Sequence, residues 1–374
     1  NQNLPQWHGV DIITRYTLRL LTIQQSRRTL GIITALEWLR NKSWVPDSFD
    51  GDRAKFSNQP VSLGIWVGGS LTPNKLLAKN NNDKTLRDYG SGWDEQLNKL
   101  GAIRILKYGH QLKDTQKNVV AEPAQILCCP ACEEHLAIPS SSKAINKIGN
   151  IKWVCKTRNI QNSFFNSVAG NIAEIKSISI TNHDNNIKTL SVEFTKFLNT
   201  EDEIENVWNQ IVSKVIDRGG GIFLKSFRAG RPGYFPKVKY EKNKPIEYDF
   251  EIHCPNPECD LNQRPWTGNL PAGVQDGTPK SNDTRIYLSD GWRTMNGDFE
   301  GRGMPIPAYT TDSQVYSKAP SVIVATVDKF AQLPKKPESG LIFGSVGSHS
   351  HCGGFSRRGV ENGELEVPFD KRIG

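Results

Sequence analysis

The sequence predicts an α/β protein in which a parallel-sheet lobe is interrupted by an α+β segment. Three observations support this fold class. Short apolar runs at residues 10–14, 61–67 and 321–326 have the composition of strands buried on both faces. Two closely spaced cysteine pairs bracket the middle of the chain. The length of 374 residues also exceeds what one ordinary core needs.

The composition argues against a membrane protein. The mean hydropathy is −0.51, and no apolar run approaches the roughly 20 residues that a spanning helix needs. The sequence shows no signal peptide, and its seven cysteines, an odd number, fit a reducing cytoplasm better than a disulfide framework. Because the chain begins with Asn1 rather than Met, we expect it to be a piece of a larger cytoplasmic protein.

The first apolar run leads into the first expected helix. Thr22 and Gln25 have the spacing of a capping box, so the helix is expected to begin near Thr22. Leu30, Ile33 and Leu36 recur at helical spacing and are expected to form the buried stripe of this helix.

The second apolar run ends in a glycine pair, Gly68 and Gly69. Glycines at the carboxyl end of a strand let backbone amides approach a phosphate, and Thr72 and Asn74 add side-chain donors. The run at 321–326 also ends in a polar turn, and polar loops at one edge of a parallel sheet form a ligand site. A glycine pair by itself is more often an ordinary turn.

The middle of the chain has the pattern of a small α+β module. Alternating apolar residues between positions 170 and 197 surround a polar turn, which predicts a hairpin. Thr200 and Glu203 have capping-box spacing before an amphipathic helix, and the glycines at 219–221 end that helix.

Two cysteine knuckles flank this module: Cys129 with Cys132, and Cys254 with Cys259. Two thiolates on a tight turn can hold one side of a tetrahedral ion, and two such pairs complete a structural zinc site. The four cysteines are therefore the expected zinc ligands, and the module becomes a zinc-containing insertion. The alternative is that these are unrelated buried or free thiols.

A basic and aromatic segment runs from residue 218 to residue 244. It contains eight Lys or Arg, one acidic residue and five aromatic residues. Cations neutralise phosphates and aromatic rings stack on unpaired bases, so the segment is a candidate accessory nucleic-acid contact. Arg228, Arg231 and Lys237 are its expected contact residues. A solvated hairpin whose aromatic residues belong to the core explains the same pattern equally well.

Four parts of the sequence together resemble a known family: the stretches Arg15–Gln25, Trp66–Asn74 and Ala325–Ala331, and the two knuckles. In this order they resemble superfamily 2 helicases of bacterial phage-defence systems. The closer resemblance is to the DrmA-like helicases of DISARM systems, with the large Druantia helicase as a relative. Residues 135–250 carry no such resemblance.

The resemblance implies a partial RecA-like lobe whose loops grip a nucleic-acid backbone. It further implies DNA as the ligand, either single-stranded or a duplex with a single-stranded end, and a partner protein of the defence system. The implied contact residues are Arg15, Arg19, Gln24, Gln25, Gly68, Gly69, Thr72, Asn74, Thr326 and Lys329.

The phosphate loop and the Asp-Glu-x-His stretch that bind nucleotide and Mg²⁺ in this family are absent from the sequence. They are expected before Asn1 and after Gly374, so ATP and Mg²⁺ are expected only in a longer protein. The predicted function is the nucleic-acid-binding portion of an ATP-dependent DNA helicase or translocase in phage defence. The alternative is a non-catalytic zinc-containing module that binds nucleic acid or protein.

The expected organisation has four parts. These are a first part of the RecA-like lobe at 1–125, a zinc-knuckle insertion domain at 126–262, an irregular connection at 263–318 and a return to the lobe at 319–374.

Overall fold

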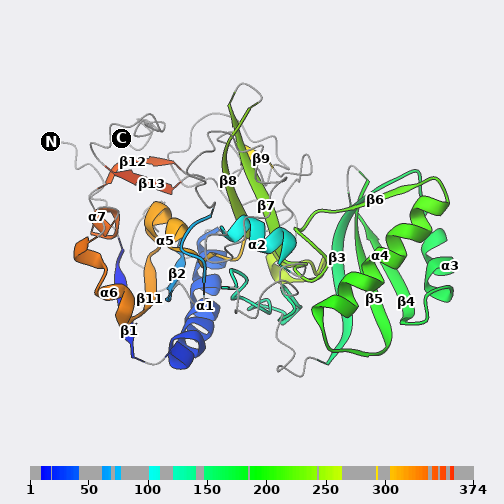
Figure 1. Cartoon of the computed structure of the whole chain (residues 1–374), viewed down its shortest axis with the longest axis horizontal. Helices are drawn as coiled ribbons and strands as arrows, with labels where there is room; N and C mark the ends of the chain where they lie inside the picture. Colours follow the sequence, from blue (N-terminus) through cyan, green and yellow to red (C-terminus); the bar gives the residue numbers. More distant parts are fainter. Residues whose placement is uncertain are drawn as a thin grey trace, which may run out of the picture.

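A computed structural model of the chain shows a parallel sheet, an antiparallel module and a long hairpin between them (Figure 1). The structure describes residues 10–17, 19–41, 61–68, 72–76, 101–109, 121–139, 147–183, 186–241, 244–262, 292–293, 304–335, 339–343, 346–350 and 354–357.

The parallel sheet has four strands in the order β1-β11-β2-β10. They are β1 (Ile12–Tyr16), β2 (Leu63–Trp66), β10 (Ala308–Tyr309) and β11 (Val322–Thr326). Every neighbouring pair in this sheet is parallel. The three apolar runs of the sequence therefore become strands of one sheet, and the mixed α/β fold is confirmed.

Helices cover both faces of this sheet. Helix α1 (Arg19–Asn41) contacts β1, β2 and β11, and Ile65 belongs to the core on its side. On the opposite face, Trp66 and Ile323 pack into a second core to which α5 (Asp312–Lys318) contributes. Burial on both faces explains why the strands read as continuous apolar runs rather than as alternating ones.

The start of α1 differs from the expected one. The helix begins at Arg19, so Thr22 lies in its first turns, and the capping box proposed for Thr22 and Gln25 is wrong. The spacing of a capping box occurs by chance in any polar helix, and the sequence alone does not distinguish a cap from an interior position.

The buried stripe of α1 is confirmed in part. Leu30 and Ile33 are buried, whereas Leu36 is exposed, which corrects its expected place in the core. Glu37 is buried instead, because its carboxylate accepts a hydrogen bond of 2.9 Å from the backbone N–H of Val61. A buried carboxylate is tolerated when it is hydrogen-bonded, and hydrophobic spacing does not report such a contact.

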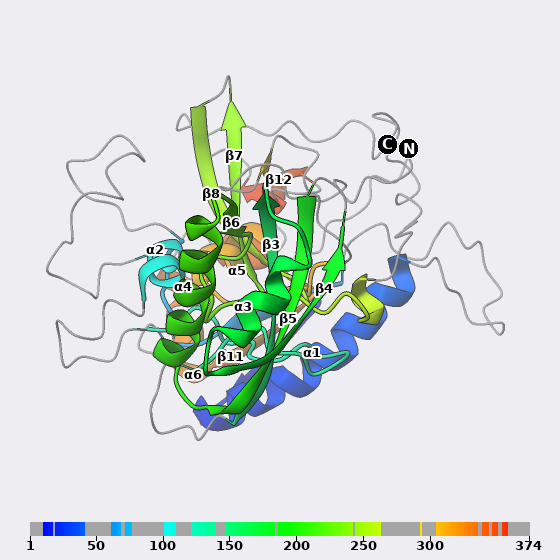
Figure 2. The same ribbon diagram turned by 90° about the vertical axis from the view of Figure 1, so that its right-hand side faces the viewer.

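The antiparallel module has its own sheet, in the order β4-β5-β3-β6. One helix connects β3 to β4 and another connects β5 to β6, so the module has the split βαβ arrangement known from ferredoxin-like folds. Both helices lie on one face of the sheet (Figure 2). The elements are β3 (Ile148–Arg158), α3 (Phe164–Gly170), β4 (Ile175–Asn182), β5 (Ile187–Leu198), α4 (Glu201–Asp217) and β6 (Gly221–Leu224).

Two local predictions for the module are confirmed. Strands β4 and β5 form the expected hairpin. The capping box at the start of α4 is complete: the Glu203 N–H donates to the Thr200 hydroxyl at 3.2 Å, and the Thr200 N–H donates to the Glu203 carboxylate at 3.1 Å. The rings of Trp153 and Trp208 pack edge to face in the core between the sheet and α4, with their centres 5.3 Å apart.

A hairpin of β7 (Tyr234–Glu241) and β8 (Lys244–Ile252) projects from the centre of the molecule (Figure 1). Tyr234 and Phe250, at the end of the hairpin away from its turn, are buried in the core that the hairpin shares with the parallel sheet. The short strand β9 (Trp292–Arg293) pairs with β7.

The remaining elements are short. Strand β10 and helix α5 already pack on the parallel sheet before residue 319, inside the segment expected to be an irregular connection. None of the described helices is both long enough and apolar enough to span a membrane. The other elements are α2 (Ala102–Tyr108), α6 (Val327–Phe330), α7 (Ser339–Ile342), β12 (Val346–Ser350) and β13 (Gly354–Arg357).

Candidate metal centre and nucleic-acid interface

The two cysteine knuckles meet in space. The sulfur atoms of Cys129, Cys132, Cys254 and Cys259 all lie within 4.8 Å of one another. The Cys129 and Cys259 sulfurs are 3.8 Å apart, and those of Cys132 and Cys254 are 3.5 Å apart. Four zinc–sulfur bonds of about 2.3 Å in a tetrahedron place the sulfurs about 3.8 Å apart, whereas a disulfide needs about 2.05 Å. The cluster therefore has the dimensions of a tetrahedral metal site.

The first knuckle is shaped by its own backbone. The Cys129 N–H donates to the Glu134 carbonyl at 2.8 Å, and the Glu133 N–H donates to the Cys129 carbonyl at 2.9 Å. Glu133 has the left-handed φ of 61°, which turns the chain back after the second cysteine. The backbone N–H groups of Ala131 and Glu134 hydrogen-bond to the Cys129 and Cys132 sulfurs, respectively. Such bonds stabilise thiolates.

The second knuckle is held by two asparagines. The Asn262 amide donates to the carbonyls of Cys254 and Asn256 at 2.7 and 2.6 Å. The Asn256 amide in turn reaches the Cys132 sulfur of the other knuckle at 3.7 Å. These contacts support the ligand geometry from outside, as the polar groups behind metal ligands commonly do.

Four thiols in contact cannot all ionise without a cation. The pKa of the Cys132 thiol is lowered by sulfur hydrogen bonds from Cys129, Cys254 and Cys259. The pKa values of Cys254 and Cys259 are raised, first of all by their hydrogen bonds to Cys129. A bound divalent ion makes all four thiolates favourable at once. The residues present thus fit a metal ion and are compatible with zinc.

The other cysteines and the nearby histidine are not part of this cluster. Cys155 is buried in the core of the module, where burial raises its pKa to about 12, and Cys128 is exposed. His253 adjoins the second knuckle, but its ring Nε2 lies 3.2 Å from the Glu251 carboxylate. Among the described residues, the four knuckle cysteines form the one group of metal-ligating side chains.

A second cluster lies where β2 and β11 end, at the edge predicted for a ligand. The Lys329 ammonium donates to the Asp312 carboxylate at 2.6 Å and to the Asn74 side-chain oxygen at 3.0 Å. Lys329 is 1% exposed, so it joins the two loops instead of presenting its charge to a phosphate, which corrects the direct contact expected of it. Thr72 and Thr326 are buried nearby in the same loops, and their hydroxyls have no hydrogen-bond partner among the described residues.

The other residues implied by the resemblance lie around this sheet. Arg15 on β1 is exposed, with its guanidinium 5.8 Å from the centre of the Phe330 ring. Gln24 is exposed on α1, Gln25 is half-buried, and Gly68 follows β2. The side chains of Arg19 and Lys237, and the whole of Gly69, lie outside the described residues.

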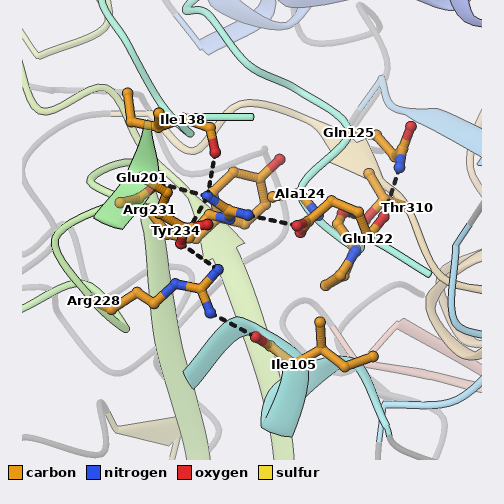
Figure 3. A network of polar contacts seen from close by, with 12 residues as sticks. Ile105, Glu122, Ala124, Gln125, Ile138, Glu201, Arg228, Arg231, Tyr234 and Thr310 are labelled. Carbon is orange, nitrogen blue, oxygen red and sulfur yellow. Dashed lines mark hydrogen bonds and ion pairs between the residues drawn. The ribbon is translucent and has the colours of Figure 1, made fainter. Parts of the chain in front are cut away.

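Arg228 and Arg231 do not lie on the surface, which corrects their assignment as nucleic-acid contacts. They are 4% and 0% exposed. Arg228 Nη2 lies 2.6 Å from the Glu201 carboxylate, and Arg231 forms ion pairs with Glu201 and Glu122 (Figure 3). The two guanidinium groups therefore neutralise the buried Glu201 and the half-buried Glu122, and they are not available to phosphates.

The network joins four parts of the chain. Arg228 donates to the Ile105 carbonyl of α2 at 2.8 Å, and Arg231 donates to the Ile138 carbonyl. Glu201 begins α4, and Glu122 precedes the first knuckle. The two arginines thus tie the antiparallel module to α2 and to the chain that leads into the cysteine cluster.

Comparison with known proteins gives one informative likeness. No known protein-family profile matches the chain. A segment of 87 residues is 40% identical to the DISARM protein DrmA of Bacillus paralicheniformis. The matched segment covers 22% of this chain and 7% of DrmA. The chain thus matches a small part of that protein, and the expected relation to DrmA is supported in part.

We expect Arg231→Ala to destabilise the protein strongly. Without Arg231, the Glu122 carboxylate loses its ion-pair partner and Glu201 keeps only Arg228. Breaking a buried ion pair by removing one partner typically costs about 3–5 kcal/mol. Urea unfolding followed by tryptophan fluorescence measures this loss. The control is Arg28→Ala, which removes an exposed arginine of α1 and is expected to change the free energy of unfolding by less than about 0.5 kcal/mol. An Arg231→Ala variant as stable as the control would contradict the structural role of the network.

The network also predicts a dependence on pH. Burial raises the pKa of Glu122, but the charges of Arg231 and Arg228 outweigh it and lower the pKa below 4.5. A lowered pKa adds stability that is fully present above the unfolded-state value and is lost as the pH falls through the folded-state value. The difference in unfolding free energy between the wild type and Glu122→Gln should be constant above about pH 5.5 and shrink below about pH 4.5. A difference that grows on acidification would reject this assignment.

Proposed function

We propose that this chain is the nucleic-acid-binding portion of the first RecA-like lobe of an ATP-dependent DNA helicase or translocase of a DISARM-type phage-defence system. The observation that carries the proposal is the 40% identity to DrmA, found in a chain whose three apolar runs form strands of one parallel sheet. The likeness to a DISARM protein suggests a role in phage defence.

The carboxyl edge of the parallel sheet is the proposed nucleic-acid contact. Strands β2 and β11 both end there, in loops that the Lys329 contacts to Asn74 and Asp312 hold together. Ligands of parallel α/β sheets bind at this edge, because the loops of several strands converge there. Arg15, at the end of the neighbouring strand β1, supplies an exposed cation. Phosphate contacts by such groups fix the position of a strand without reading its sequence.

The cysteine cluster is the proposed zinc site, with a structural role. All four ligands come from the protein, and Cys129, Cys254 and Cys259 are buried within the core that α1 shares with the parallel sheet. A structural site of this kind leaves no position open for a reacting water. Zinc here ties the two ends of the module to the lobe, which makes the module a zinc-bearing insertion in the RecA-like lobe.

The motor chemistry is proposed for the longer protein. ATP and Mg²⁺ bind there through motifs that this sequence does not contain. The proposed ligand is DNA, either single-stranded or a duplex with a single-stranded end, in the cytoplasm, together with a partner protein of the defence system. A non-catalytic zinc module is the competing function, and a phosphate loop encoded before Asn1 would decide for the motor.

The zinc proposal predicts about one zinc ion per chain by elemental analysis of the purified protein. Cys129→Ser combined with Cys132→Ser removes two of the four ligands, so we expect loss of the ion and a lower melting temperature. Cys128→Ser is the matched control, because it changes the neighbouring exposed thiol and should keep the ion. A double variant that folds normally and retains zinc would refute the assignment.

The nucleic-acid proposal predicts salt-sensitive binding of single-stranded DNA with little preference for sequence. Arg15→Ala should weaken binding to every oligonucleotide alike and lower the slope of log affinity against log salt by about 0.7. Lys214→Ala removes an exposed cation from α4 of the module and should change neither quantity. Fluorescence anisotropy of labelled oligonucleotides at several salt concentrations measures both. Unchanged affinity and slope in Arg15→Ala would argue against binding at this edge.

A further inference from the structure

The antiparallel module presents one face of its sheet without helices, and the middle of that face is covered. In β3, Ile151, Trp153 and Cys155 belong to the core with the helices, so the alternate residues point to the opposite face. There, Lys152 forms an ion pair with Glu134. Val154 packs in a small core with Phe235 of β7 and Ile187 of β5.

The end of this face at β6 stays open. Phe223, in strand β6, is 58% exposed there. Phenylalanine side chains are more often buried in the core. The register pairs Phe223 with Lys156, and Gly221 with Arg158. The Phe223 ring lies over Gly221: a Cβ atom added at that glycine would be 3.0 Å from the ring. The ring therefore occupies the space beside Arg158 that a side chain at position 221 would fill.

Two cations border this ring. Lys156 and Arg158 are both exposed, and they stand two residues apart on β3, roughly 6.6 Å along the strand. Within the described part of the chain, neither forms an ion pair. On its other side Lys156 is paired with Ile187, so the register places no carboxylate next to it. The corner thus combines a fixed, exposed aromatic face with two uncompensated positive charges.

The opposite end of the same face has a second exposed ring. Phe197 is 59% exposed, and its ring lies 3.1 Å from a Cβ atom added at Gly149. Lys147 is exposed two residues before Gly149, and the exposed Lys196 precedes Phe197 in β5. A substitution of Phe197 therefore tests whether losing any exposed phenylalanine of this face weakens binding.

We propose that Phe223, Lys156 and Arg158 form a second contact for single-stranded nucleic acid, separate from the edge of the parallel sheet. One unpaired base stacks on the Phe223 ring, and the phosphates on either side of that base approach Lys156 and Arg158. The stacking requires an unpaired base, because the faces of bases in a duplex are already covered by their neighbours. This inference rests on the proposed nucleic-acid-binding function and moves the accessory contact from the buried Arg228 and Arg231 to the surface of the module.

The test is binding of a labelled oligothymidine to the full chain, measured by fluorescence anisotropy at several salt concentrations. Phe223→Leu removes the ring and should weaken binding about tenfold, whereas Phe223→Trp keeps a stacking surface and should bind at least as well as the wild type. The double variant Lys156→Ala, Arg158→Ala should lower the salt slope by about 1.4, which is about 0.7 for each phosphate contact on a single strand. Phe197→Leu and Lys214→Ala are the matched controls and should leave affinity and slope unchanged.

The outcomes separate this contact from the proposed function. If Arg15→Ala weakens binding while Phe223→Leu and the double variant bind like the wild type, the second contact is refuted and the sheet edge stands; the ring then fits a protein partner. If Phe223→Leu and Phe223→Trp weaken binding equally, stacking on the ring is refuted. If none of these variants changes affinity or slope, the proposed nucleic-acid function fails as well.

Discussion

The junction between the parallel sheet and the antiparallel module depends on buried charges that are neutralised in pairs. Arg228 and Arg231 are withdrawn from water, which is unfavourable unless carboxylates and carbonyls take up their hydrogen bonds. Glu201 and Glu122 do so from two distant parts of the chain. Because a buried charge without its partner costs several kcal/mol, this arrangement disfavours other placements of the module against the lobe.

The cysteine cluster also gathers like charges that need a partner, but here the charges are negative. Its four sulfurs are close enough that their thiolates repel one another, and a divalent ion between them turns the repulsion into a stabilising contact. Both clusters lie on the path from the lobe into the module: Glu122 precedes the first knuckle by seven residues, and Tyr234 hydrogen-bonds through its hydroxyl to the backbone of Ile126 between them. The cysteine cluster and the arginine network thus lie at one junction. Strand β6, which carries Phe223, leads directly into it.

Sequence patterns anticipated contacts that are local or that involve one kind of chemistry. The capping box at Thr200 and Glu203 and the hairpin of β4 and β5 are decided within a few residues, and both are present. The cysteines are far apart in the chain, but thiolates at knuckle spacing have few structural uses other than metal binding, so their meeting was predictable. Charged residues have many uses. Lys329, Arg228 and Arg231 read as phosphate contacts, and each is instead buried against a carboxylate that is distant in sequence.

By itself, the sequence determined the mixed α/β class, three of the four strands of the parallel sheet and the four clustered cysteines, because apolar runs and cysteine spacing are visible along the chain. Only the tertiary structure decided which cations stay at the surface. That choice depends on whether a carboxylate from another part of the chain lies beside the cation. Asp312 pairs with Lys329, and Glu201 pairs with Arg228. The strand neighbours of Lys156 are Ile187 and Phe223, and the neighbour of Arg158 is Gly221. The free energy of burying a charge is set by its partners in space, which the order of residues along the chain does not specify.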